Sequence, residues 1–176
     1  MATLTKAEIL DALRRLGELA EQQGDLVELL LVGGAAMVLL YDARVATRDV
    51  DVLIRSPKEA RRVRALALQV ATDYDLPKDW LNDGAKGYIV GISEGHDVFS
   101  APGIVVSTPS VAQLLAMKLS AWRDDVDIND AAQLLQALTG EQEHVWSMVE
   151  PYLVPGNELK ARYAFLDLWE AIYDRN

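Results

Sequence analysis

The chain has 176 residues, of which 51% are hydrophobic, so it is long and apolar enough for a substantial core and is not a disordered chain. Its formal net charge of -10 argues against global attraction to nucleic acid, because proteins held by many phosphate contacts are normally basic. The absence of cysteine excludes disulfides and cysteine-based zinc sites. With no apolar run of membrane-spanning length and no secretory pattern at the N-terminus, we expect a cytoplasmic protein that does not bind membranes.

Apolar periodicity and turn residues divide the chain into elements. The predicted helices cover residues 4–23, 35–41, 57–71, 110–122, 128–138, 141–152 and 158–173. The predicted strands cover residues 29–32, 49–54, 88–92, 97–99 and 103–106, and residues 72–87 are expected to form a loop with a short helical turn near Trp80. Pro57 suits the first turn of its helix, and Ser107 or Thr108 is expected to cap the helix after Pro109.

This order of elements predicts an α+β fold with a small mixed β-sheet, packed helices and a helical C-terminal tail. No internal repeat or boundary interrupts it, so we expect a single domain over residues 1–176. Its sheet core is expected over about residues 26–107 and its helical part over about 109–175.

Two motifs in the first half of the chain are candidates for binding an anion and a metal ion. Gly33-Gly34 stands between a predicted strand and helix, where glycines permit a sharp turn and the helix N-terminus attracts anions. Asp49 and Asp51 are expected on one face of the next strand, about 6.5 Å apart. Mg²⁺ is typically held by one or two carboxylates together with substrate phosphates. The pattern favours a metal site over the alternative, a solvated strand end beside a turn.

Two further motifs follow in the helical half. Lys118 lies on an otherwise apolar helix face, so it must extend to solvent or pair with an acid or a phosphate. Asp127 and Asp130 share a face at the start of the next predicted helix, where the helix dipole or a capping role accounts for acids. The alternative is that one of them orients Lys118 or Arg123, or acts as a third active-site acid.

In this order, the motifs resemble the AbiEii-type branch of the DNA polymerase beta-like nucleotidyltransferases. That family has a Gly-Gly motif, a Thr-x-Asp-hydrophobic-Asp motif, a helical Lys and a late Asp-x-x-Asp motif. The corresponding segments here are LVGGAAMVLL, ATRDVDVLI, LLAMKLSAWR and DINDAAQLL. WLNDGAKGYI is also similar to the smaller members of this branch, and the resemblance covers roughly residues 29–138.

The resemblance implies a nucleotidyltransferase fold and a Mg²⁺-dependent transfer of a nucleoside monophosphate from a nucleoside triphosphate. The acceptor would be a hydroxyl of RNA, such as tRNA, or of a protein, and the protein would be the toxin of a toxin–antitoxin pair. Asp49 and Asp51 would bind the metal. The implied catalytic residues are Asp49, Asp51, Lys118, Asp127 and Asp130. The implied nucleotide-binding residues are Gly33, Gly34, Thr47, Arg48, Lys118 and Arg123.

Departures from the family pattern keep a second hypothesis open, a catalytically inactive nucleotide-binding or interaction module. Ala35 stands where many nucleotidyltransferases have a hydroxyl residue after the glycines. A third carboxylate has no clear counterpart, although Asp97 is a candidate. Trp80 and Lys86 are candidates for bordering the nucleotide. The helical tail offers a surface for a homodimer, and a small antitoxin is the other partner that the resemblance implies.

Overall fold

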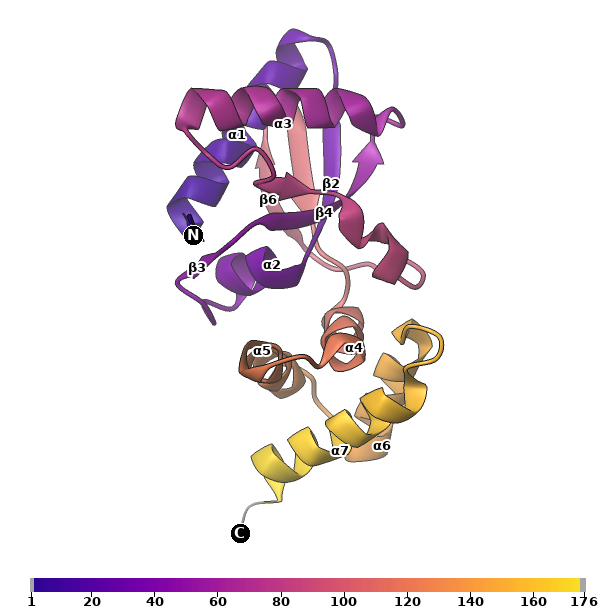
Figure 1. The fold of residues 1–176 in the computed structure, drawn as a ribbon. Coiled ribbons are helices and arrows are strands. Elements are labelled where there is room, and N and C mark those ends of the chain that lie inside the picture. The colour runs from indigo at the N-terminus through magenta and orange to yellow at the C-terminus, as the bar shows by residue number, and fades with distance from the viewer. Residues whose placement is uncertain (1, 175–176) are drawn as a thin grey trace. The chain divides into compact units, whose positions relative to one another are not determined.

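The computed structural model describes residues 2–174, which form two compact units (Figure 1). Unit 1 comprises the chain up to Gly87 together with Gly95–Thr108. Unit 2 comprises Tyr88–Glu94 and the chain from Pro109 onward. Within residues 2–174, no helix combines the length and the apolar character needed to cross a membrane.

Unit 1 is built on a mixed five-stranded sheet. Its strands are β2 (Val27–Val32), β4 (Val50–Ser56), β5 (Leu81–Asn82), β6 (Asp97–Ala101) and β7 (Ile104–Ser107), in the spatial order β5-β4-β2-β7-β6. The pairs β2–β4 and β6–β7 are antiparallel, whereas β2–β7 and β4–β5 are parallel. Central strand β2 is almost wholly apolar and its residues Leu29–Val32 are buried, as expected for a strand covered on both faces. The predicted mixed sheet is therefore confirmed.

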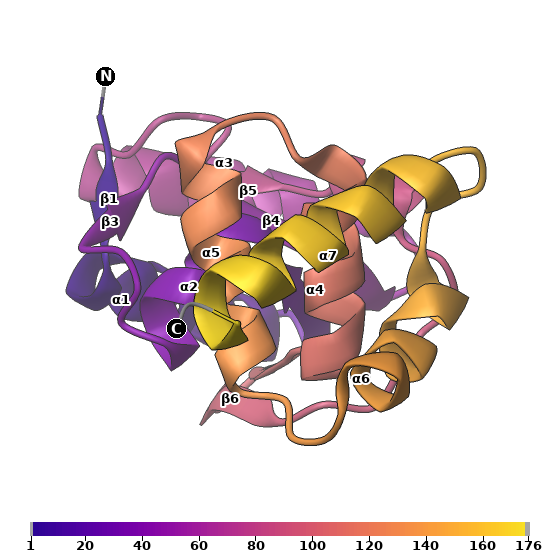
Figure 2. The same cartoon turned by 90° about the horizontal axis from the view of Figure 1, so that it is seen from below.

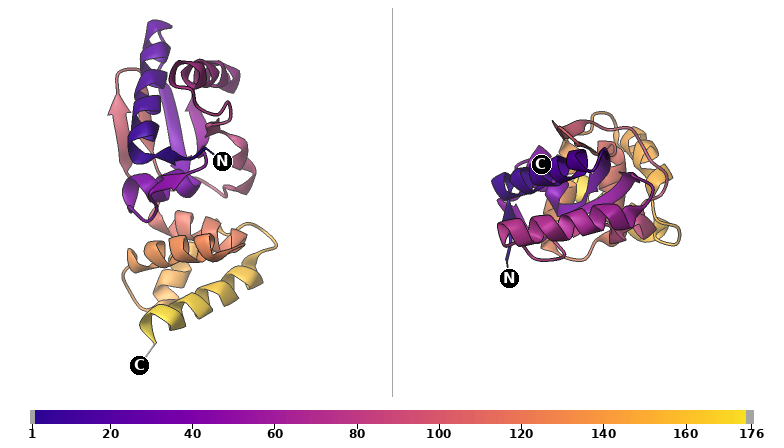
Figure 3. Two further views of the ribbon diagram at one scale, coloured as in Figure 1. Left: turned by 60° about the vertical axis from the view of Figure 1, so that its left-hand side comes forward. Right: turned by 90° about the horizontal axis from the view of Figure 1, so that it is seen from above.

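Helices α1 (Lys6–Gln22) and α3 (Ala60–Tyr74) pack against each other and against β6, β7 and β4, so they cover one face of the sheet (Figure 3). A capping box between Thr5 and Glu8 fixes the start of α1. Short helix α2 (Gly33–Leu40) follows β2 directly and is buried, as its uniformly apolar sequence predicts. A separate two-stranded sheet pairs β1 (Leu4–Thr5) with β3 (Ala46–Thr47).

Unit 2 consists mainly of helices (Figure 2). They are α4 (Val111–Ala121), α5 (Asp125–Gln136), α6 (Gln142–Val149), the 3-10 turn η2 (Glu150–Tyr152) and α7 (Glu158–Tyr173). Helix α4 contacts α5, α6 and α7. Phe165 on α7 lies between Trp146 and Trp169, with ring centroids 5.2 and 5.7 Å away. The tilted contact between Trp146 and Phe165 joins α6 to α7.

Several predicted helix starts are wrong by a few residues. Helix α3 begins at Ala60, and Pro57 lies in the preceding turn after a cis peptide bond. Ser110 caps α4 by accepting a hydrogen bond from the Gln113 amide, so neither Ser107 nor Thr108 is the cap. Asp124 caps α5 in the same way. Local patterns fix a helix start only to within a few residues, and the hydrogen bond to the cap decides among neighbouring polar residues.

The predicted strand over residues 88–92 is also wrong. Residues 84–88 form a 3-10 turn, η1 (Gly84–Tyr88), and the backbone that follows is tied to the side chain of Gln113. Gln113 is fully buried; its amide donates to the carbonyls of Val90 and Gly91 and accepts from the amide and hydroxyl of Ser93. A helical side chain thus provides the hydrogen bonds that a neighbouring strand would supply.

Gln113→Leu should lower the free energy of unfolding by about 3 kcal/mol, because it removes the partners of the buried Ser93 amide and hydroxyl and of two part-buried carbonyls. Urea unfolding followed by tryptophan fluorescence measures the change. Gln69→Leu, at an exposed position of α3, is the control and should alter stability by less than about 0.5 kcal/mol. Equal stability of the two variants would contradict a structural role for Gln113.

Candidate functional site

The turn from β2 into α2 lies directly against an acidic side chain of the neighbouring strand. Asp51 on β4 pairs with Val32, the last residue of β2, so its carboxylate is next to Gly33. A Cβ atom added to Gly33 would come within 2.6 Å of Asp51 Oδ2. Gly33 also has a φ of +67°, which residues with a Cβ seldom adopt. Both backbone and neighbour therefore require glycine here, and Asp51 faces the Gly-Gly turn as predicted.

The second glycine meets a different pair of side chains. A Cβ added to Gly34 would lie 2.5 Å from Thr47 Oγ1 and 2.8 Å from Arg44 Nη1. Thr47 is buried and is placed by the pairing of β3 with β1. The start of α2 thus lies among a carboxylate, a hydroxyl and a guanidinium. Sequence reasoning included Thr47 but missed Arg44, whose only signal is its position three residues before Thr47.

Asp49 does not belong to the strand that was predicted to carry it. Strand β4 begins at Val50, whose amide bonds to the Trp80 carbonyl, and Asp49 precedes it as a half-buried residue. Burial raises the pKa of Asp49, the Arg48 guanidinium lowers it in part, and the negative charge of Asp79 raises it further. Ionised Asp49 therefore carries an electrostatic cost at neutral pH, which a bound cation would reduce.

Asn82 is a neighbour of Asp51 that sequence reasoning did not select. It pairs with Asp51 across the β4–β5 ladder, and its Nδ2 donates to Asp51 Oδ1 at 3.2 Å. The motif WLNDGAKGYI contained the signal, but the parallel pairing of a two-residue strand cannot be read from local patterns. Trp80, by contrast, is fully buried and donates from Nε1 to the Ala67 carbonyl, so it does not border a nucleotide. Lys86 is exposed on η1.

Within residues 2–174, no cluster of three or more His, Asp or Glu side chains is arranged to hold a metal ion. Asp97, the sequence candidate for a third carboxylate, lies on β6, which is separated from β4 by β2 and β7. Three strand spacings amount to about 14 Å, too far for one metal ion to bridge. Asp49 and Asp51 stay the predicted metal ligands, and a pair of carboxylates would suit Mg²⁺ completed by phosphate oxygens.

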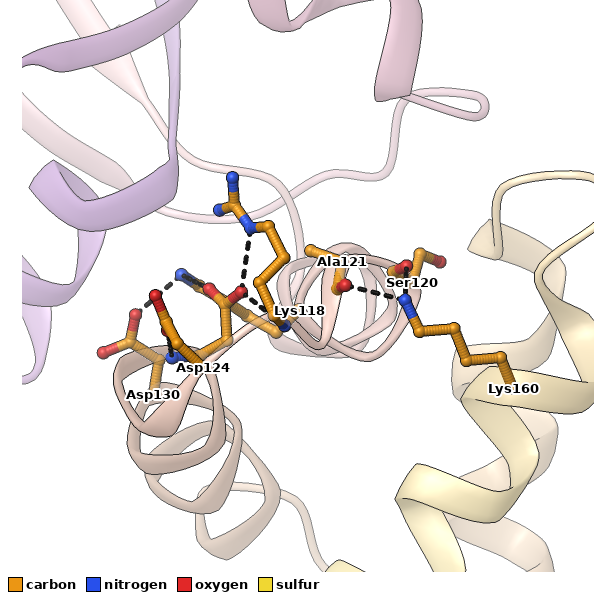
Figure 4. A network of polar contacts seen from close by, with 8 residues as sticks. Lys118, Ser120, Ala121, Asp124, Asp130 and Lys160 are labelled. Atoms are coloured by element: carbon orange, nitrogen blue, oxygen red, sulfur yellow. Dashed lines mark hydrogen bonds and ion pairs between the residues drawn. The ribbon is translucent and has the colours of Figure 1, made fainter.

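In unit 2, Lys118 on α4 is paired with two acids of α5 (Figure 4). Its Nζ lies 3.1 Å from Asp127 Oδ1 and 2.7 Å from Asp130 Oδ2, and both carboxylates are almost fully buried. Arg123 adds hydrogen bonds from its Nε and its amide to Asp127 Oδ2, both at 3.1 Å. We call these four residues the lysine cluster. Lys118 therefore pairs with acids rather than extending to solvent.

The cluster also fixes the junction between α4 and α5. Burial raises the pKa of Asp127, but hydrogen bonds from Arg123 and Lys118 outweigh it and leave the pKa below its usual range. Asp124 caps α5 by accepting from the Asp127 amide at 3.0 Å. On the other side, Lys160 of α7 donates to the Ala121 carbonyl at 2.8 Å, where a cation at a helix C-terminus is favourable (Figure 4).

The structure thus brings the sequence candidates together in two groups. Within unit 1, Gly33, Gly34, Thr47 and Asp51 are in close contact, and Asp49 and the exposed Arg48 precede β4. Within unit 2, Lys118, Arg123, Asp127 and Asp130 form the lysine cluster. The catalytic and nucleotide-binding roles of these residues stay predictions.

Comparison with known proteins identifies a family. A family model described as a nucleotidyltransferase of unknown function, DUF6036, matches residues 8–149. Neither a curated relative nor a solved structure matches the chain. The resemblance to nucleotidyltransferases is therefore confirmed at the level of the superfamily, whereas the AbiEii-type branch stays a prediction.

Gly33→Ala should be more destabilising than Gly24→Ala, although both glycines have a positive φ. Nothing lies within 4 Å of a Cβ at Gly24, so that variant pays only the backbone cost of about 1–2 kcal/mol. At Gly33 the clash with Asp51 should add about 1–3 kcal/mol. Urea unfolding followed by circular dichroism tests the difference, and equal losses would argue against a tight contact with Asp51.

Asp127→Asn should lower the free energy of unfolding at pH 7 by about 2 kcal/mol, because it removes one of the two charged partners of the mostly buried Lys118. Since folding lowers the pKa of Asp127, its stabilisation is complete above the unfolded pKa near 4 and is lost as the pH falls through the lower folded value. The difference in the free energy of unfolding between the variant and the parent protein, measured by urea unfolding, should therefore become smaller from pH 7 toward pH 2.

Asp125→Asn is the matched control, because Asp125 is exposed in the first turn of the same helix. Its effect should stay below about 1 kcal/mol, as expected for a charge acting on the helix dipole alone. If Asp127→Asn lowered the free energy of unfolding by the same amount at every pH, that result would contradict the ionic origin of the stabilisation.

Proposed function

Because the chain belongs to the DUF6036 family of nucleotidyltransferases, we propose that unit 1 binds a nucleoside triphosphate with Mg²⁺ and transfers its nucleoside monophosphate to an acceptor hydroxyl. The observation that carries this proposal is the contact of Asp51 Oδ2 with the Gly33 backbone, where a Cβ would lie only 2.6 Å away. A carboxylate held against a glycine turn at a helix N-terminus suits a cation bridged to phosphate.

Each group at this turn has a distinct role in the proposal. The first amides of α2 donate to phosphate oxygens, because the leading N–H groups of a helix have no partner within the helix. Asp51 and Asp49 would hold the cation, whose charge would favour the ionised form of the half-buried Asp49. Thr47 and Arg44, which lie against Gly34, supply a hydroxyl and a guanidinium for the phosphates.

The reaction breaks one phosphoanhydride bond and forms one phosphoester bond. The acceptor oxygen attacks the α-phosphorus, a new P–O bond forms, and the bond from the α-phosphorus to the bridging oxygen breaks. Pyrophosphate departs with the electron pair, and the hydroxyl proton passes to solvent or to a carboxylate. When bound, Mg²⁺ neutralises phosphate charge and lowers the pKa of the attacking hydroxyl.

The acceptor is a hydroxyl of a protein or of RNA, and the charge of the chain favours a protein. A net charge of -10 opposes the approach of a long RNA backbone, so binding of tRNA must overcome this repulsion through local contacts.

The proposed toxin role, with an antitoxin partner, predicts that expression of the chain arrests growth and that Asp51→Asn relieves the arrest. A homodimer through the helical tail is a further part of this hypothesis.

A nucleotide-binding module without catalysis is the second candidate. The hydroxyl-free Ala35 and the position of Asp97 on β6, about 14 Å from β4, favour it. Calorimetry with nucleoside triphosphates and Mg²⁺ distinguishes the two, because tight binding without turnover supports the module.

The proposed transfer can be tested by incubating the protein with Mg²⁺, total tRNA or a protein extract, and each nucleoside triphosphate labelled on its α-phosphate. Label should enter RNA or protein, whereas label on the γ-phosphate should leave with pyrophosphate. Asp51→Asn should lower transfer at least about 100-fold, because it removes a metal ligand.

Asp11→Asn is the control, because Asp11 is exposed on α1 and pairs with a neighbouring arginine at the surface. It should leave transfer unchanged. Transfer by Asp51→Asn at the unmutated rate would refute the proposal, and transfer of the γ-label would instead indicate a phosphotransferase.

A further inference from the structure

Strand β5 brings one amide side chain into line with the central acid of unit 1. The strand has only two residues, and its parallel pairing with β4 sets Asn82 directly beside Asp51. Asn82 Nδ2 donates to Asp51 Oδ1 at 3.2 Å. The other oxygen of the same carboxylate, Oδ2, is the one that lies against Gly33. The two carboxylate oxygens therefore face different neighbours.

The orientation of the Asn82 amide is fixed by a second bond. Its Oδ1 accepts from the Gly84 amide at 2.9 Å. A backbone N–H can only donate, so the carbonyl end of the side chain must face Gly84 and the NH₂ end must face Asp51. The donor to Asp51 is thus specified by chemistry.

The backbone on both sides of Asn82 is anchored to α3. Trp80 is fully buried and its Nε1 donates to the Ala67 carbonyl. Arg64 donates a bidentate pair of hydrogen bonds to Asp83, from Nε to Oδ1 at 3.1 Å and from Nη2 to Oδ2 at 2.5 Å. These anchors hold β5 against β4, and this lowers the entropic cost of the Asn82–Asp51 bond.

We propose that Asn82 is a positioning residue that fixes the Asp51 carboxylate so that Oδ2 is presented to the cation at the Gly33 turn; this rests on the proposed function. An amide suits this role better than lysine or arginine. It donates a hydrogen bond and restricts rotation of the carboxylate, yet it leaves the negative charge that a cation needs. Outer hydrogen bonds of this kind orient metal ligands in many proteins.

The test measures how much Mg²⁺ the site requires. Calorimetry with a non-hydrolysable nucleoside triphosphate analogue, repeated over a range of Mg²⁺ concentrations, gives the concentration for half-maximal binding. Asn82→Ala should raise this midpoint about 10–100-fold, and excess Mg²⁺ should restore binding, because the substitution leaves both carboxylates in place. A residue that only supported the fold would lower thermal stability without moving the midpoint.

Two further variants keep the test decisive. Gly84→Ala places a Cβ 3.0 Å from Asn82 Oδ1, so it should displace the amide and raise the midpoint in the same direction by a smaller factor. Gly84→Ala also tests the proposal by itself if Asn82→Ala does not fold. Asn157→Ala is the matched control: Asn157 immediately precedes α7 in unit 2, its side chain makes no capping bond, and the midpoint should not move.

The outcomes separate this inference from the proposed function. If the parent protein shows no Mg²⁺-dependent binding of the analogue, the proposed function fails and the inference fails with it. If the parent binds but neither Asn82→Ala nor Gly84→Ala moves the midpoint, the positioning role alone is refuted. A raised midpoint that excess Mg²⁺ overcomes supports both.

Discussion

The contact between the Gly33 backbone and the Asp51 carboxylate is the constraint on which the candidate site depends. It needs a residue without a Cβ at the end of β2, and it needs β4 to pair with β2 in the register that sets Asp51 opposite Val32. A shift of one residue would turn Asp51 to the other face and bring a valine to the glycine turn. The alternation of β4, with Val50 and Val52 buried, fixes that register.

The lysine cluster is the corresponding constraint in unit 2. Removing two carboxylates and an ammonium from water is costly, and the cluster offsets that cost with short contacts from Lys118 and Arg123. Each charge removed weakens the compensation of the remaining buried charges, so the cluster ties the end of α4 to the start of α5. This structural contribution accompanies any catalytic role, and mutational data on activity must be read together with stability.

Individual elements show which features of the fold and of the site could be predicted from the sequence. Helix α7 has the predicted bounds, because a long amphipathic repeat bounded by turn residues is a strong local signal. The facing of Asp51 toward Gly33 followed from the strand-turn-helix order. Asp97 was a candidate for a third acid because it is a carboxylate on a predicted strand, and only the sheet order, with two strands between β4 and β6, places it away from Asp51. Residues 88–92 have the composition of a strand, but Gln113 satisfies their backbone instead.

The sequence by itself determined the mixed α+β class, the glycine turn, the paired acids and the membership in a nucleotidyltransferase family, because these depend on periodicity and on residue order along the chain. Tertiary structure alone decided that Asn82 lies beside Asp51, that Arg44 lies against Gly34, and that Lys118 is held by two acids. Each of these contacts joins residues on different elements. Such pairings arise from strand register and helix packing, which local patterns do not encode.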